Sequence, residues 1–235
     1  MAPLKLDTHC HSKYSSNSRL SLEFLAAQGR QGSSAVVVCT DHGSMEATAR
    51  LREVLPEALV IPGIEIEADE GDFLVYSTDA DYLRSLEKFH GSVAEIRRDN
   101  ETAVVWAHPC VTQRVDLSKT EKIRSCDCGG LDREQIAVIM RHIDGLELFN
   151  GTLLTLATHG LIRPTYFNNL RYLAKVNNLA CTGGSDAHEE EAWCKAWTEF
   201  HMPIRSVDDF IAAIKNRKVK PAYDREFFDT DVESV

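Results

Sequence analysis

The chain has 235 residues, a formal charge of -10 and seven cysteines. This length is normal for a single α/β barrel and allows a buried core without disulfides or a structural metal. The acidic balance argues against a large nucleic-acid interface, which needs a basic face. No apolar run approaches the roughly 20 residues that cross a bilayer, and Met1 to Leu6 does not resemble a signal peptide. We therefore expect a soluble, cytoplasmic protein with reduced cysteines.

Apolar runs rich in β-branched residues alternate with segments of helical periodicity. Strands are predicted over 4–6, 35–39, 59–66, 73–76, 103–106, 145–148, 179–182 and 196–200. Helices are predicted near 21–29, 45–55, 81–98, 133–141, 164–176 and 207–216. Repeated strand and helix indicate a parallel sheet. The irregular segment 110–132 is interpreted as a lid, a substrate loop or a surface insertion, and the tail after Tyr223 is expected to pack loosely.

Short polar clusters follow several of these apolar runs. In a strand, side chains at i and i+2 share a face, so His9 and His11 can point at one metal together. Further metal-competent side chains occupy the same place relative to their own strands: His42, Glu65, His108, Asp186 and His188. Because the ends of barrel strands converge on one face, we expect all these side chains to meet in one site.

A mixed set of imidazoles and carboxylates suits Zn²⁺, Mn²⁺ or Fe²⁺ better than Mg²⁺ or Ca²⁺, which prefer oxygen ligands. The set is too large for one tetrahedral ion. The sequence therefore predicts two or three divalent ions, bridged by a carboxylate such as Glu65 or Asp186.

The order of the motifs HxH at 9–11, TDH at 40–42, GxE at 63–65, HP at 108–109 and GSDAH at 184–188 resembles the PHP superfamily. This is the polymerase and histidinol phosphatase superfamily of metal-dependent phosphoesterases. The resemblance extends from Leu6 to about Val219. It implies a distorted (β/α)7 barrel, with residues 1–235 as a single domain and a core over about 4–219. It also implies a di- or trinuclear metal centre. The implied ligands are His9, His11, His42, Glu65, His108, Asp186 and His188.

Two positions depart from the family pattern. After Tyr14 the family usually supplies an aspartate or histidine ligand, and Asn17 is the nearest substitute in this chain. After the GxE motif many members have a histidine, and this chain has Asp72. Asn17 and Asp72 are therefore candidate metal ligands. Asn150 matches a position near the site in the family and is a candidate substrate contact.

The resemblance implies hydrolysis of a phosphate ester, and we predict in-line attack on phosphorus by a metal-bridging hydroxide. Asp186 or His188 would pass a proton to the leaving alkoxide, or both would act as ligands only. Phosphate oxygens also need cationic donors. The candidates, close in sequence to the metal motifs, are Lys13, Arg19 and Arg114.

The expected substrate is a small phosphorylated molecule, because the chain is acidic and compact. Nucleotides, nucleoside bisphosphates and histidinol phosphate are family substrates. An exonuclease acting on nucleic-acid ends is a less favoured alternative. Two alternatives from other classes are a metal-dependent amidohydrolase and a non-catalytic domain that keeps metals for stability and binds partners. The sequence predicts no membrane association and indicates no particular oligomeric state.

Overall fold

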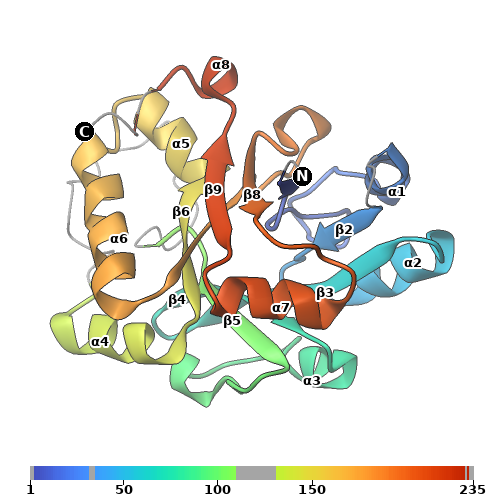
Figure 1. Cartoon of the computed structure of the whole chain (residues 1–235), viewed down its shortest axis with the longest axis horizontal. Helices are drawn as coiled ribbons and strands as arrows, with labels where there is room; N and C mark the ends of the chain where they lie inside the picture. The colour runs from blue at the N-terminus through green and yellow to red at the C-terminus, as the bar shows by residue number, and fades with distance from the viewer. Residues whose placement is uncertain (1–2, 32–34, 110–130, 231, 233–235) are drawn as a thin grey trace.

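The computed structural model describes residues 3–31, 35–109, 131–230 and 232. Figure 1 shows strands at the centre of the molecule and helices around them. The strands are β1 Leu4–Leu6, β2 Val36–Cys39, β3 Leu59–Ala68, β4 Gly71–Ser77, β5 Thr102–Trp106, β6 Gly145–Asn150, β7 Ala180–Gly184, β8 Ala196–Phe200 and β9 Val219–Tyr223. The helices are α1 Leu22–Gln31, α2 Glu46–Val54, α3 Ala80–Ser85, α4 Arg133–His142, α5 Gly151–Thr158, α6 Pro164–Asn177, α7 Val207–Lys215 and α8 Arg225–Phe228, with short 3-10 helices η1 Val93–Glu95 and η2 Glu190–Ala192.

One curled sheet has the strand order β2-β3-β4-β5-β6-β7. The pairs β2–β3, β5–β6 and β6–β7 are parallel, whereas β4 is antiparallel to both β3 and β5. Only the turn at Asp69 and Glu70 separates β3 from β4. A connection this short joins antiparallel strands, because a parallel pair needs a long crossover. The expected parallel arrangement is therefore interrupted at β4.

The N-terminal segment closes this sheet into a ring at one end. β1 itself pairs with β8 in a second, antiparallel sheet of order β1-β8-β9. Just beyond β1, Asp186 N–H donates to His9 O and Thr40 N–H donates to Cys10 O. Cys10 also forms a parallel bridge with Ala187. The segment therefore lies between the ends of β7 and β2, and the predicted distorted α/β barrel is confirmed.

Helix α7 covers the opposite end of the barrel. It packs against β3, β4 and β5 and crosses the lower front of the view in Figure 1. Its Phe210 shares a core cluster with Ile61, Ala103 and Ala180, which lie at or near the beginnings of β3, β5 and β7. The Phe210 ring also contacts Tyr76, with ring centroids 5.0 Å apart. This apolar packing leaves the other end of the barrel for the polar side chains that follow the strands.

Two local predictions were wrong, and two elements were missed. The helix expected over 81–98 is reduced to α3 and η1, because Ser92 caps a new 3-10 helix instead of continuing the first one. Helix α5 and strand β9 were not predicted. The tail does not pack loosely, since Phe228 and Val232 are buried at 4% and 0% exposure. No helix in the described part of the chain has the length and apolar character needed to cross a membrane.

Gly184, the last residue of β7, lies too close to the N-terminal segment for any side chain. A Cβ there would be 2.4 Å from His9 Cβ and 2.7 Å from Glu147 Oε1. We predict that Gly184→Ala lowers the free energy of unfolding in urea by about 3 kcal/mol. Gly160→Ala is the control, because nothing lies within 4 Å of its Cβ and only its φ of +68° is unfavourable. The control should cost about 1 kcal/mol, and an equal loss in both variants would contradict the assigned contact.

Candidate metal centre

His9 and His11 present the same ring nitrogen to the centre of the site. His9 Nδ1 lies 3.1 Å from both carboxylate oxygens of Glu147. His11 Nδ1 lies 3.2 Å from Ser15 Oγ, and the Ser15 hydroxyl itself donates to Asp41 Oδ1 at 2.7 Å. Both Nδ1 atoms are therefore placed to carry the proton, so each Nε2 keeps its lone pair for a metal. Burial also lowers the pKa of His11 to about 4, which keeps its ring neutral.

Four donor atoms meet at the spacing of one tetrahedral ion. His9 Nε2 and His11 Nε2 are 3.1 Å apart. Glu65 Oε2 lies 3.3 and 3.2 Å from these two nitrogens, and Asp186 Oδ1 lies 3.5 and 3.1 Å from them. Ligands at about 2.0–2.1 Å from a tetrahedral ion are about 3.3 Å from one another. In the first group, which consists of His9, His11, Glu65 and Asp186, each carboxylate oxygen therefore lies at coordination-shell distance from both imidazole nitrogens.

A second group shares Glu65 with the first. Glu65 Oε1 lies 3.0 Å from His108 Nε2, and Asp72 Oδ2 lies 3.8 Å from His108 Nδ1. One ligand atom from each of Glu65, Asp72 and His108 falls within 4.8 Å of the others. Asp72, a substitute ligand in the sequence prediction, therefore lies where it can take part. Burial raises the pKa of Asp72 to about 6.

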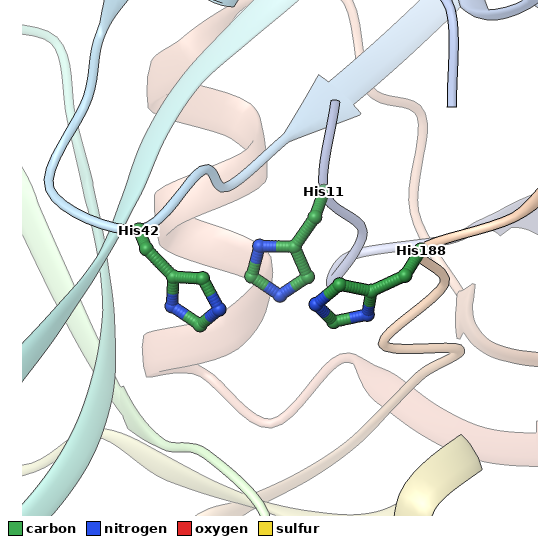
Figure 2. A group of neighbouring side chains, drawn as sticks. All are labelled: His11, His42 and His188. Atoms are coloured by element: carbon green, nitrogen blue, oxygen red, sulfur yellow. The ribbon is translucent and has the colours of Figure 1, made fainter. Parts of the chain in front are cut away.

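A third group consists of imidazoles only. His11, His42 and His188 offer ring nitrogens within 4.8 Å of one another. Figure 2 shows the three rings side by side, each carried by a separate segment of the chain. His42 Nδ1 lies 2.9 Å from Glu65 Oε2. His188 Nδ1 lies 2.8 Å from the backbone carbonyl oxygen of Asp186, two residues earlier, and is placed to donate to it.

Without a bound ion, the carboxylates and imidazoles of the centre shift one another's pKa. Burial alone would raise the pKa of Glu65, but the imidazoles of His9, His108 and His42 hold it well below its usual value. Burial would lower the pKa of His9, but the carboxylates of Glu147 and Glu65 raise it well above its usual value. These opposed effects show a dense buried cluster of opposite charges.

Three buried polar atoms in the described part of the chain lack a hydrogen-bond partner: Glu65 Oε2, His188 Nε2 and, outside the centre, Trp197 Nε1. A buried acceptor without a partner is costly, so such atoms call for an explanation. Asp186 and His108 also adopt left-handed backbone conformations, with φ of 54° and 26°, which are uncommon outside glycine and concentrate at functional sites. The donor set, its spacing and the two unpartnered atoms of the centre fit a divalent metal.

Sequence reasoning missed the residues that position these donors. Glu147 accepts a hydrogen bond from His108 N–H at 2.9 Å as well as contacting His9. Asp7 accepts hydrogen bonds from Ser185 N–H and Cys194 N–H, at 2.9 and 2.8 Å, and burial raises its pKa to about 6. The signal that could have revealed Glu147 is an acidic residue inside the apolar strand β6.

Asn150 is fully buried between Glu147 and the start of α5. Its Nδ2 donates to Glu147 Oε2 at 2.9 Å. Its Oδ1 accepts hydrogen bonds from Thr152 N–H and Leu153 N–H, at 2.8 and 3.3 Å, and so caps the helix. These contacts engage the whole amide group, and contact between Asn150 and a substrate stays a prediction.

The cationic candidates that are described lie at the surface. Lys13 is exposed, with Nζ 5.7 Å from the centroid of the Tyr14 ring. The Arg19 side chain is 85% exposed, and its Nη1 lies 3.7 Å from Glu189 Oε1, one residue beyond His188. Asn17 is exposed as well. Arg114 and most of the segment 110–132 lie outside the described residues. The metal and substrate roles of these residues stay predictions.

A family model described as PHP-associated matches residues 168–219. No curated protein matches the sequence. A solved two-domain protein from Bacteroides vulgatus, containing a predicted PHP-like metal-dependent phosphoesterase, is 18% identical with a TM-score of 0.62, covering 94% of this chain and 64% of that one. PsfC from Pseudomonas syringae is 18% identical with a TM-score of 0.63, covering 95% of this chain and 92% of that one.

Other similar structures carry the names of several hydrolase classes. One from Bifidobacterium adolescentis, assigned as a metal-dependent phosphoesterase, is 17% identical with a TM-score of 0.57, covering 81% of this chain and 90% of that one. Others are named as an amidohydrolase from Chromobacterium violaceum and the lesion-specific endonuclease PfuEndoQ from Pyrococcus furiosus. At these identities the likeness shows a common fold. The PHP-associated model matches the C-terminal part of the chain, residues 168–219.

The contact between Glu147 and His9 can be tested through metal affinity. Gln at position 147 keeps the size of the side chain but replaces one acceptor oxygen with a donor, so it no longer fixes the His9 tautomer. We predict that Glu147→Gln weakens the binding of Mn²⁺ by about 10- to 100-fold in calorimetric titration. Glu226→Gln, at an exposed position, is the matched control and should bind as the wild type does. Equal affinities in both variants would remove Glu147 from the metal centre.

Proposed function

We propose that the protein is a metal-dependent hydrolase that cleaves phosphate esters. The observation that carries this proposal is the spacing of His9, His11, Glu65 and Asp186, in which each carboxylate oxygen lies at coordination-shell distance from both imidazole nitrogens, beside a second group that shares Glu65. The PHP-associated match and the similar structures named as phosphoesterases add support. Two or three ions of Zn²⁺, Mn²⁺ or Fe²⁺ and a cytoplasmic location belong to the same proposal.

Bound divalent ions would neutralise phosphoryl oxygens and supply a nucleophile at neutral pH. The residues of the chain fix where this happens. Glu65 offers one oxygen to each of the two carboxylate-containing groups. Thr152 Oγ1 donates to Asp186 Oδ2 at 2.8 Å, which leaves Oδ1 facing His11 Nε2. This pre-formed arrangement needs no rearrangement of side chains when the ions bind.

His188 is the group that we propose for proton movement at the site. Its Nδ1 donates to a backbone carbonyl, so its Nε2 is free to accept a proton from water or from a substrate hydroxyl. Asp186 is the alternative acceptor named by the sequence, but Thr152 Oγ1 donates to its Oδ2, and its Oδ1 lies among the donor atoms of the first group. His188 Nε2 is therefore the more available proton acceptor of these two side chains.

The substrate would approach over His42 and His188. Their side chains are 47% and 28% exposed, whereas those of His9 and His11 are fully buried. Arg19 lies beside this opening, because its N–H donates to His188 O at 2.8 Å. We propose that Arg19 and Lys13 bind phosphate there. The net charge of -10 favours a small phosphorylated molecule over a nucleic acid.

The proposed activity predicts metal-dependent phosphate release. The chelator-treated protein should be inactive, and Mn²⁺ should restore release of phosphate from at least one member of a panel of nucleotides, nucleoside bisphosphates, histidinol phosphate and short oligonucleotides. The double variant His9→Ala/His11→Ala should fall to the background rate, because the first group loses both nitrogens. His201→Ala, at an exposed position, should keep wild-type turnover.

Two outcomes would contradict the proposal. Hydrolysis of amides in place of phosphate esters would favour the amidohydrolase class. Metal binding that raises the melting temperature without turnover of any phosphate ester would favour a metal-stabilised binding domain.

A further inference from the structure

The third group differs from the first in the way its rings face one another. The His11 ring is 4.2 Å from the His42 ring and 4.4 Å from the His188 ring, centroid to centroid, with interplanar angles of 23° and 29°. Figure 2 shows His11 between the other two. The lone pair of an imidazole nitrogen lies in the plane of its ring, so stacked rings direct their lone pairs side by side. They do not converge on one ion.

The rings of His9 and His11 show the opposite arrangement. Their planes are inclined at 64° with centroids 5.0 Å apart, and their Nε2 atoms are 3.1 Å apart. Two inclined rings can direct both lone pairs at one point. Because His11 Nδ1 contacts Ser15 Oγ, its Nε2 is the one atom that His11 can offer to a metal. That atom lies among the donors of the first group, 3.2 Å from Glu65 Oε2 and 3.1 Å from Asp186 Oδ1.

Without His11, an ion in the third group would have His42 and His188 as its remaining ligands. Among the described residues, the three-residue group that contains His42 and His188 has no carboxylate. The carboxylate oxygen beside His42, Glu65 Oε2 at 2.9 Å from Nδ1, already belongs to the first group, so such an ion would have no carboxylate of its own. Two neutral ligands at a partly exposed position make a weak site, because water competes for the ion and no charge is neutralised.

We infer that the centre holds two divalent ions that share Glu65, with His42 and His188 outside both coordination shells. The first ion belongs to His9, His11, Glu65 and Asp186, and the second belongs to Glu65, Asp72 and His108. His42 and His188 then line the open side, where they contact the substrate. The ion count stands by itself, whereas this substrate contact rests on the proposed function.

His42 and His188, which bind no ion in this arrangement, have different roles on the open side. His188 Nε2 is buried, without a partner among the described residues, and bare because Nδ1 donates to a carbonyl. It can therefore accept a hydrogen bond from a hydroxyl of the substrate or from a water molecule. His42 Nδ1 lies 2.9 Å from Glu65 Oε2 and can hold that oxygen in place. Neither contact needs a third ion.

The test is the number of Mn²⁺ ions that the full-length protein binds without substrate. The protein is stripped with chelator, titrated with Mn²⁺ by calorimetry, and analysed for metal after gel filtration. We expect two equivalents in the wild type, with an exchange-coupled electron paramagnetic resonance spectrum from the shared carboxylate. His42→Gln and His188→Gln should keep two equivalents and the coupled spectrum. His108→Gln should bind one equivalent and lose the coupling, and His201→Gln should match the wild type.

Three tight equivalents in the wild type would overturn the inference. So would the loss of one equivalent in a folded His42→Gln or His188→Gln protein, with folding checked by circular dichroism. Kinetics test the substrate contact separately. With an active phosphate ester, His188→Gln should raise KM at least about tenfold while metal content stays at two equivalents. Failure to find any hydrolysed ester would contradict the proposed function and leave the ion count as measured.

Discussion

Glu65 places an ionised carboxylate inside the barrel, within 3.3 Å of the ring nitrogens of His9, His11, His42 and His108. A buried carboxylate is stable only when opposite charge surrounds it. The imidazoles meet that need in part, and a divalent ion would meet it fully. His9 and His11 come from the N-terminal segment, His42 follows β2 and His108 follows β5, so these elements have to be held in register around this one side chain. The shape of the barrel end follows from that requirement.

Further buried carboxylates keep the donors in place. Glu147 contacts the ring of His9, while Asp41 accepts hydrogen bonds from Ser12 and Ser15, which flank His11 along the chain. Asp7 accepts a hydrogen bond from Ser185 N–H and so connects the loop after β7 to the segment that carries His9 and His11. Each of these carboxylates restricts the orientation of a donor side chain or of the segment that carries it. These contacts orient the donors without an ion, which favours tight binding and defined chemistry.

The sequence predicted that the candidate donors lie together because each follows an apolar strand. His42 and His108 were placed beside Glu65 from this position alone, and the structure brings a ring nitrogen of each within 3.0 Å of a Glu65 oxygen. Glu147 was missed because one acidic residue in the short run of β6 resembles a solvent-facing position. Helix α5 was missed because Gly151 begins it, and its need for glycine is apparent only where a Cβ would meet Ser185 O at 1.9 Å. Strand β9 was missed because Pro221 is unusual within a strand.

The sequence by itself determined the alternation of strands and helices, the metal-binding side chains and their order along the chain, because periodicity and residue chemistry are local properties. Tertiary structure decided that β4 runs antiparallel and that the segment carrying His9 closes the ring between β7 and β2. It also decided which nitrogen of each imidazole faces the centre, and that His42 stacks on His11. These features depend on contacts between residues distant along the chain, and no local pattern records a distance or an angle between them.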